Sequence, residues 1–414
     1  MLTLYRILVK FVERILPISA YFSPKMKLFV EGRKTVFKTL SQQFSSSDNV
    51  IWMHAASLGE YEQGLPVLKE IKTHYPSYKI LISFFSPSGY EVKKNNPYAD
   101  VTVYLPIDTQ ANAKRFIKLV RPKLALFIKY EIWPNYLLQL HKQNVPALLI
   151  SGNFRPNQLY FKAYGRFMKR ALQTFDHLFV QTKAAQKLLE SHGIHKVTCS
   201  GDTRYDRVHA QLDMDNRLDF VDEFKGNRLC VVCGSTWPED ENLLLNFINQ
   251  AEKDIAFIIA PHQIKAEHLE TLQSGIQKTT LLFSQRKNHK LKDYQVLLID
   301  AVGFLSKVYA YADIAYVGGA AGKTGLHNIL EPATFGVPIL IGSNHQNFPE
   351  AAALEKVGGL FVVKNPQECT QILNKLTHQT EFRLSTGQKA HQFIENGRGA
   401  TATIVNYIEE HLKL

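Results

Sequence analysis

Short apolar runs alternate with longer amphipathic stretches along most of this 414-residue chain, and the pattern occurs twice. Such runs, bounded by turn residues, are typical of buried strands, whereas apolar residues spaced three or four apart are typical of helices. We expect strands at 50–55, 80–84, 124–128, 147–150, 178–180 and 197–200, and again at 229–233, 256–260, 296–299, 314–317, 339–341 and 360–363. Strands that alternate with helices predict parallel sheets covered on both faces.

A polar stretch without a long apolar run interrupts this rhythm and divides the chain into two α/β halves. The expected parts are a basic amphipathic segment at 1–45, a Rossmann-like domain at 46–206, a linker at 207–227, a second Rossmann-like domain at 228–395 and a C-terminal helix at 396–414. Parallel sheets bind ligands at the carboxyl ends of their strands. We therefore expect two Rossmann-like domains facing a central cleft that holds the ligands.

The composition is that of an ordinary globular protein, with 45% apolar and 21% charged residues, but the net charge is +12. This excess favours an anionic partner, which could be nucleic acid, an acidic membrane surface or a phosphorylated substrate. Cys230 and Cys233 have the C-x-x-C spacing of metal and redox sites. They lie in an apolar run without a second Cys or His pair, so a buried strand is the better interpretation.

The first forty residues hold eight Lys/Arg and two Glu, a net charge of +6. Leu4, Leu8, Phe11 and Ile15 recur at helical spacing beside a separate basic stripe. A basic amphipathic helix can lie in the headgroup region of an anionic membrane. A helix packed on its own domain would have the same pattern. The basic residues beyond the helix favour the membrane, although no apolar run is long enough to span one.

Polar motifs follow the expected strands of the first half. Glu60 lies at a strand-to-helix turn, where a carboxylate can remove a proton from an attacking hydroxyl. Ser57-x-x-Glu60 also matches a capping box, which the pattern alone favours. Glu131 is either a second site carboxylate or a helix N-terminal acid, and Arg204 either holds an anion or forms a linker salt bridge. Residues that could line a polar ligand site on this side are Ser57, Gly59, Ser88 and Gly89.

The second half has similar motifs after its strands. Ser235 and Thr236 lie in a Gly-Ser-Thr turn before a helix, which could bind an anion or only cap that helix. Pro261-His262 follows the next strand, where His262 could reach a phosphate or a base. Gly318-Gly319 would let a ligand approach the backbone closely.

Asn328 and Glu331 are three residues apart on one expected helix, so both could face a ligand from its first turn. A carboxylate there can accept both hydroxyls of a ribose, which predicts a nucleotide site. The chain has neither G-x-G-x-x-G nor the full G-x-x-x-x-G-K-[ST] motif of a phosphate loop, because Val317 stands where the first glycine before Gly322-Lys323-Thr324 would be. Their absence argues against a dinucleotide oxidoreductase and a P-loop NTPase.

Five motifs in this order resemble one known family. They are Ser57-Leu58-Gly59-Glu60, Ser86-Pro87-Ser88-Gly89, Glu131-Ile132-Trp133-Pro134-Asn135, Gly201-Asp202-Thr203-Arg204-Tyr205-Asp206, and His327-Asn328-Ile329-Leu330-Glu331-Pro332 followed by Asn347-Phe348. The sequence resembles, over nearly its whole length, the Kdo transferases, which attach 3-deoxy-D-manno-octulosonic acid to the lipid A precursor in Gram-negative bacteria. The resemblance implies a GT-B fold, a CMP-Kdo donor, and inverting transfer without a metal or a resident cofactor.

The resemblance also assigns roles to residues. It makes Glu60 the base, Glu131 its supporting acid and Arg204 the cation that assists at the transition state. It places the CMP site at Pro261, His262, Ala301, Val302, Gly303, Asn328 and Glu331, with Ser235 and Thr236 nearby. At the position of Arg204 the family usually has Lys, and at the position of His262 it usually has Arg. It also has Gly-Glu-Leu at Gly303-Phe304-Leu305 and Gly-Gly-His-Asn at Gly325-Leu326-His327-Asn328.

The implied partners are CMP-Kdo, the lipid A precursor and the anionic cytoplasmic face of the inner membrane, bound peripherally or through the N-terminus. Two other interpretations fit the same cleft. One is another GT-B envelope transferase that uses a UDP-sugar, and the other is a nucleotide-sugar-binding membrane scaffold without catalysis. The two carboxylates Glu60 and Glu131 favour an enzyme over the scaffold. Nucleic acid is not an expected partner, because no recognised nucleic-acid-binding module occurs.

Overall fold

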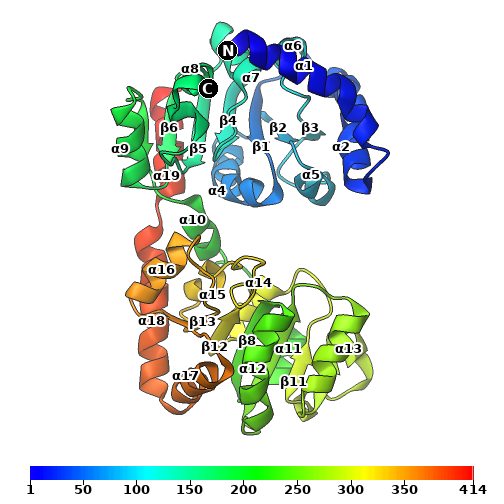
Figure 1. The fold of residues 1–414 in the computed structure, drawn as a ribbon, viewed down its shortest axis with the longest axis vertical. Coiled ribbons are helices and arrows are strands. Elements are labelled where there is room, and N and C mark those ends of the chain that lie inside the picture. Colours follow the sequence, from blue (N-terminus) through cyan, green and yellow to red (C-terminus); the bar gives the residue numbers. More distant parts are fainter. Residues whose placement is uncertain (413) are drawn as a thin grey trace. The chain divides into compact units, whose positions relative to one another are not determined.

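The computed structural model describes residues 1–412 and 414 (Figure 1). The chain divides into two compact units: the first comprises Met1–Arg207 with Arg398–Leu414, and the second comprises Val208–Gly397. Each unit contains its own seven-stranded parallel sheet. The expected α/β class with two Rossmann-like parallel sheets is therefore confirmed.

The sheet of the first unit has the strand order β3-β2-β1-β4-β5-β6-β7. Its strands are β1 (Val50–Ala55), β2 (Lys79–Phe84), β3 (Val101–Tyr104), β4 (Pro122–Ile128), β5 (Ala147–Gly152), β6 (His177–Val180) and β7 (Val197–Cys199). Strand β1 is buried on both faces, and Trp52 packs into one core while Ile51 and Met53 pack into the other. The strand order reverses between β1 and β4, which is where sheets of this kind bind ligands.

Helices cover both faces of this sheet. They are α3 (Val36–Gln43), α4 (Leu58–His74), α5 (Pro87–Lys93), α6 (Gln110–Val120), α7 (Pro134–Lys142), α8 (Arg166–Leu172), α9 (Lys183–Ser191) and α19 (Ala400–His411). Helix α19, red in Figure 1, returns to the first unit from the end of the chain. Its Ile404 and Ile408 are fully buried in the same core as Ile51 and Met53.

The second unit has the strand order β10-β11-β9-β8-β12-β13-β14, which reverses between β8 and β12. Its strands are β8 (Leu229–Thr236), β9 (Ile255–Pro261), β10 (Thr280–Leu282), β11 (Val296–Leu298), β12 (Ile314–Val317), β13 (Ile339–Ile341) and β14 (Leu360–Val362). Its helices are α11 (Asp219–Lys225), α12 (Pro238–Gln250), α13 (Ala266–Gly275), α14 (Leu305–Val308), α15 (Leu330–Thr334), α16 (Pro349–Lys356), α17 (Pro366–His378) and α18 (Thr380–Gly397). Helix α10 (Thr203–His209) contains the boundary between the units.

Three expectations about local structure can be compared with the fold. Gly234-Ser235-Thr236 is the end of β8 rather than a turn, because the strand continues to pair with β9 up to Thr236. The stretch 207–227 is not only a linker but contains α11, whose Val221 and Phe224 are buried. Cys230 and Cys233 are buried in β8, as the apolar run predicted, and burial raises the pKa of Cys230 to about 12.

The N-terminal helix α1 (Leu2–Ser19) has no buried residue. Its polar side chains hold it on the first unit: the Tyr5 hydroxyl donates to Asp108 (2.7 Å) and the Arg6 guanidinium donates to Asn135 (2.9 Å). Most of its apolar side chains are exposed instead, including Ile7 at 61% and Phe11 at 59%. No helix among residues 1–412 and 414 is long and apolar enough to cross a membrane.

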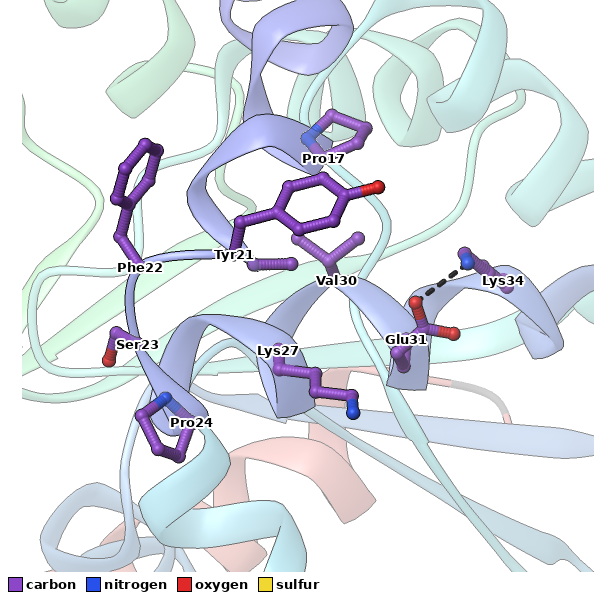
Figure 2. A pocket seen from close by; sticks show the side chains of 10 residues that line it. Pro17, Tyr21, Phe22, Ser23, Pro24, Lys27, Val30, Glu31 and Lys34 are labelled. Carbon is purple, nitrogen blue, oxygen red and sulfur yellow. Dashed lines mark hydrogen bonds and ion pairs between the residues drawn. The ribbon is translucent and has the colours of Figure 1, made fainter.

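Helix α1 is followed by α2 (Pro24–Lys34), and the turn between them exposes two aromatic side chains, Tyr21 and Phe22. A hollow of about 680 Å³ lies at this turn. Figure 2 shows Tyr21, Lys27 and Lys34 among the side chains that line it. Apolar and basic groups are thus exposed together in this part of the first unit.

Candidate functional site

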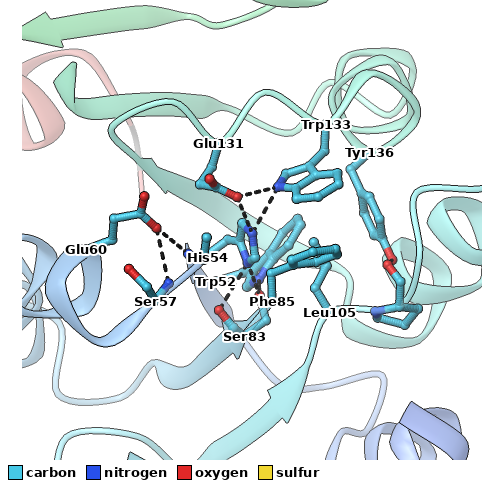
Figure 3. Close-up of polar contacts among 12 residues, drawn as sticks. Trp52, His54, Ser57, Glu60, Ser83, Phe85, Leu105, Glu131, Trp133 and Tyr136 are labelled. Atoms are coloured by element: carbon cyan, nitrogen blue, oxygen red, sulfur yellow. Dashed lines mark hydrogen bonds and ion pairs between the residues drawn. The ribbon is translucent and has the colours of Figure 1, made fainter. Parts of the chain in front are cut away.

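Two carboxylates follow the two strands at which the order of the first sheet reverses. Glu60 follows β1 in the first turn of α4, and Glu131 follows β4 in the loop before α7. Figure 3 shows both side chains at the carboxyl ends of these strands. Because β1 and β4 are hydrogen-bonded neighbours, the fold brings together two acids that are 71 residues apart in the sequence.

Glu60 has the capping-box geometry that its motif predicted. Its Oε2 accepts the backbone N–H groups of Ala56 (2.6 Å) and Ser57 (3.2 Å), and the Ser57 side chain accepts the N–H of Glu60. The role in capping therefore uses one carboxylate oxygen. Burial and then the charge of Glu131 raise the pKa of Glu60 to about 7, which outweighs the amide bonds and the positive charge of Lys129. A carboxyl with this pKa exchanges protons near neutral pH, as a general base requires.

Glu131 is held by a buried network that includes His54 (Figure 3). The Trp133 indole N–H donates to Glu131 Oε2 (2.8 Å), and His54 Nε2 lies 3.1 Å from the same oxygen. On its other side, His54 Nδ1 lies 2.9 Å from Ser83 Oγ and 3.0 Å from the Ser83 carbonyl oxygen. Protonated Nε2 donates to Glu131, whereas unprotonated Nε2 accepts from Trp133 at 3.0 Å. His54 thus orients Glu131.

His54 lies within the Trp52–Glu60 motif but was not predicted to be a site residue. In the sequence it is one position in an apolar strand, and its partners Ser83 and Glu131 are 29 and 77 residues away. A histidine inside an apolar run that ends at a candidate base is the sequence signal that could have identified it.

The remaining expected residues of the first unit occupy the same edge or its neighbours. Gly59 is exposed, and a Cβ built on it would meet no atom within 4 Å. A Cβ on Gly89, in contrast, would lie 2.3 Å from the Phe84 ring, so packing requires this glycine. The Ser88 hydroxyl is exposed and lies 2.9 Å from that of Ser86, the N-cap of α5.

Arg204 lies in the first turn of α10 and forms the salt bridge that was its alternative role. Its guanidinium contacts Asp202 through Nε at 2.9 Å and through a terminal nitrogen at 2.8 Å. The preceding Thr203 donates its hydroxyl proton to the carbonyl oxygen of Gln63 (2.6 Å) in α4. The element that carries Arg204 is therefore packed on the helix that begins next to Glu60.

In the second unit, Asp240 organises the loops at the point where the sheet order reverses. This buried carboxylate accepts the N–H groups of Gly319 (2.8 Å) and Ala321 (3.2 Å) and the hydroxyl proton of Tyr316 (2.9 Å). A Cβ on Gly318 would lie 2.3 Å from the Ser235 carbonyl oxygen. The chain's own backbone therefore requires glycine at this position.

Ser235 and Thr236 are not equivalent. Ser235 has a left-handed backbone, with φ of +55°. Thr236 is fully buried, and its hydroxyl donates to Glu241 (2.9 Å). The Thr236 hydroxyl therefore donates its proton within the second unit rather than to a ligand.

Three rings stack at the carboxyl ends of β8 and β9 and in the loop after β12. The His262 ring lies 4.7 Å from Trp237 and 4.5 Å from His327, measured between ring centroids. Burial and then the charge of His262 lower the pKa of His327 to about 4. His327 is thus neutral near pH 7, while exposed His262 presents one edge to solvent. Aromatic rings grouped in this way can contact a base or a sugar ring.

Asn328 and Glu331 are adjacent, but not on one helix as expected. Helix α15 begins at Leu330, and the Asn328 side chain precedes it and accepts the Leu330 N–H (3.1 Å). The Asn328 amide donates to one oxygen of Glu331 (3.0 Å), and the Ser306 hydroxyl donates to the other (3.0 Å). Ser306 belongs to α14, which closely follows the expected turn at Ala301, Val302 and Gly303. In that turn Val302 is 84% exposed.

No group of three His, Cys, Asp or Glu side chains within residues 1–412 and 414 is placed to hold a metal ion. Glu60 and Glu131 of the first unit are instead bound by backbone amides, an indole and a histidine. Glu331 of the second unit is bound by a side-chain amide and a hydroxyl.

Comparison with known proteins relates this arrangement to one family. Residues 31–207 match the family model described as 3-deoxy-D-manno-octulosonic-acid transferase (Kdo transferase). The 3-deoxy-D-manno-octulosonic acid transferase of Haemophilus influenzae is 28% identical over 378 residues, which are 88% of this chain and 87% of the relative. Both Glu60 and Glu131 lie within the residues that the family model matches.

Two solved structures have a similar fold. The UDP-GlcNAc 2-epimerase of Neisseria meningitidis, solved with bound UDP-GlcNAc, has a TM-score of 0.64 at 16% identity and covers 88% of this chain and 100% of its own. MurG of Acinetobacter baumannii has a TM-score of 0.56 at 13% identity, over 88% of this chain and 99% of its own. At these identities the likeness is one of fold alone, and it confirms the GT-B class.

Proposed function

Because this chain is similar to the Kdo transferases, we propose that it transfers Kdo from CMP-Kdo to the lipid A precursor in lipopolysaccharide biosynthesis. The observation that carries the proposal is the pair of carboxylates at the reversal point of the first sheet. Glu60 there has a pKa of about 7, and Glu131 is fixed beside it by His54 and Trp133.

In the proposed reaction Glu60 removes the proton from an acceptor hydroxyl. The oxygen attacks the anomeric carbon of Kdo, and a carbon–oxygen bond forms on the face opposite the nucleotide. The bond from that carbon to the phosphate oxygen breaks, and CMP leaves with the electron pair, so the configuration inverts. Arg204 offsets the negative charge that develops on CMP. The reaction uses no metal and no resident cofactor, so activity is expected to persist in excess EDTA.

The stacked rings of the second unit are the proposed nucleotide site. His262 and Trp237 would contact the cytosine or sugar ring, and Asn328 and Glu331 would exchange their mutual bond for bonds to the ribose hydroxyls. A thermal shift with CMP but not with UDP would support the assignment over a UDP-sugar transferase.

The direct test is mass-detected transfer from CMP-Kdo to lipid IVA. Glu60→Gln should lower kcat by roughly 10²- to 10⁴-fold, because a general base is lost, and should leave CMP binding unchanged. Glu70→Gln is the matched control, since Glu70 lies on the same helix with a half-exposed side chain. Near-normal turnover of Glu60→Gln would contradict the assignment of the base, and an inactive wild-type chain would contradict the function.

We also propose that α1 binds the anionic cytoplasmic face of the inner membrane. Tyr5 and Arg6 bond to the first unit while Ile7, Phe11 and other apolar side chains face outward, unlike in a helix whose apolar face packs on its own domain. Phe11→Glu should abolish flotation with anionic vesicles, because a charge replaces the inserted ring. Leu384→Glu, at a residue that is 64% exposed in α18, is the control. Equal flotation of both variants would contradict this orientation.

A further inference from the structure

Lys129 occupies a strained position at the edge of the first sheet. It is the first residue after β4, and its backbone φ is +61°. Residues other than glycine adopt this left-handed region at a conformational cost, and such strain is concentrated at functional sites. The Lys129 N–H donates to the carbonyl oxygen of Ile150 (2.9 Å) in β5. This bond fixes the backbone of Lys129 at the strand ends where Glu60 and Glu131 lie.

Lys129 is a half-buried residue, yet its ammonium group makes no hydrogen bond and no ion pair with any residue that the structure describes. It is still close enough to Glu60 for its positive charge to lower the pKa of that carboxyl, against the effects of burial and of Glu131. A lysine retained for stability would be expected to pair with a carboxylate or to extend into water. Lys129 has no such partner among the described residues and is half-buried, which leaves its three donors available at the site.

The charged and titratable groups around Glu60 come from three elements. Glu131, Tyr130 and Lys129 itself follow β4, and His54 at the end of β1 contacts Glu131. Arg155, after β5, is exposed and lowers the pKa of Tyr130, opposing the effect of burial. Two cations thus lie on the β4 and β5 side of the two acids. This arrangement would attract an anionic substrate toward an otherwise acidic site.

We propose that Lys129 is a substrate-binding residue of the first unit, and that its ammonium binds an oxyanion of the substrate that approaches Glu60. The inference rests on the proposed function, in which both substrates carry such a group. The oxyanion is either the carboxylate of the transferred sugar acid or a phosphate of the lipid acceptor. A flexible point charge with three donors suits either group.

The test measures kcat and KM for each substrate with the full chain. Lys129→Met should raise KM roughly 10- to 100-fold for one substrate, the loss expected for a charge-assisted hydrogen bond. A rise for CMP-Kdo would identify the sugar carboxylate, and a rise for the acceptor would identify its phosphate. Lys129→Arg should retain most of the affinity. Arg121→Met is the control. Arg121 is also a basic residue with a left-handed backbone conformation, with φ of +48°, but it lies at the opposite end of β4.

Lys129→Gly separates binding from folding. Glycine adopts positive φ without strain, so this variant should melt no lower than the wild type while losing affinity like Lys129→Met. Unchanged KM for both substrates in both variants would overturn the inference. A shift of the acid limb of the pH profile to higher pH without a change in KM would also overturn it, because Lys129 would then act only through Glu60. These outcomes require active wild-type protein, whereas an inactive wild type would overturn the proposed function itself.

Discussion

Glu60 is held in a state that favours function over stability. Its carboxyl has a pKa of about 7 in the folded chain, compared with 4.5 for an ordinary glutamate. The folded state therefore binds more protons than the unfolded state between these two values, and the free energy of unfolding falls as the pH rises through that window. This loss of stability is caused by burial and by the charge of Glu131. The same two features make Glu60 suitable as a base near neutral pH.

Replacing Glu60 by glutamine should remove this pH-dependent loss. The glutamine side chain would keep an oxygen for the amides of Ala56 and Ser57 but would carry no charge. Between pH 5 and pH 8 the stability of Glu60→Gln relative to the wild type should increase by about 1–2 kcal/mol, less than the full shift because the side chain is only partly buried. Urea titrations at the two pH values measure the difference. A constant difference would show that Glu60 ionises normally.

The pH dependence of activity also tests the ionisation of Glu60. Turnover should increase with pH with a midpoint near 7, since the base must be ionised. Glu131→Gln removes the second largest cause of the raised pKa, so the midpoint should move to lower pH even where kcat falls. An unchanged midpoint would show that the charge of Glu131 does not affect the pKa of Glu60.

At the scale of single elements, the first turn of α4 provides a test of ligand approach. A Cβ on Gly59 meets no atom within 4 Å, so Gly59→Ala should stabilise the helix by up to about 1 kcal/mol. If acceptor binds against this turn, the added methyl group should raise its KM without lowering the melting temperature. Gly64→Ala on the same helix is the contrast, because its Cβ would lie 2.7 Å from Met53 Sδ and should destabilise the fold. Unchanged kinetics of Gly59→Ala would place the acceptor elsewhere.

The elements that the sequence could predict are those whose signal is local. Long apolar runs such as β1 and β4 were located to within about two residues, and the acids that follow them were identified with them. The edge strands β3 and β10 were missed because they are only four and three residues long. Helix α18 has only a weak sequence signal, because it is mostly polar and contains Gly387, whose missing Cβ lets Gly336 approach. Each of these depends on tertiary packing.

The candidate site shows the same division. Glu60 and Glu131 are recognisable because each directly follows a strand, whereas the contact of His54 with Glu131 depends on the adjacency of β1 and β4. The stack of Trp237, His262 and His327 likewise joins three separate loops. Asn328 was assigned to a helix because its spacing from Glu331 fits one, but its side chain instead bonds to the Leu330 N–H before the helix begins.

At the scale of the whole molecule, the chain begins and ends in the same unit. Residues 208–397 form the second unit from one continuous segment, whereas the first unit needs α19 from the far end of the chain. Ile404 and Ile408 of α19 are fully buried and Val405 is nearly so, in a core shared with β1 and β2. Burial of three such side chains contributes roughly 5–9 kcal/mol, which is comparable with the whole stability of a domain.

We therefore expect the two units to differ when separated. A fragment of residues 208–397 should fold alone and unfold in one cooperative transition. A fragment of residues 1–207 should lack a cooperative transition unless a peptide of residues 398–414 is added. In the full chain, Ile408→Asp should remove the transition of the first unit and leave that of the second, because a charge replaces a buried side chain. Ala402→Asp, at an exposed position on the same helix, should leave both transitions in place. Cooperative folding of residues 1–207 without the peptide would show that α19 only covers the first unit and is not needed to form it.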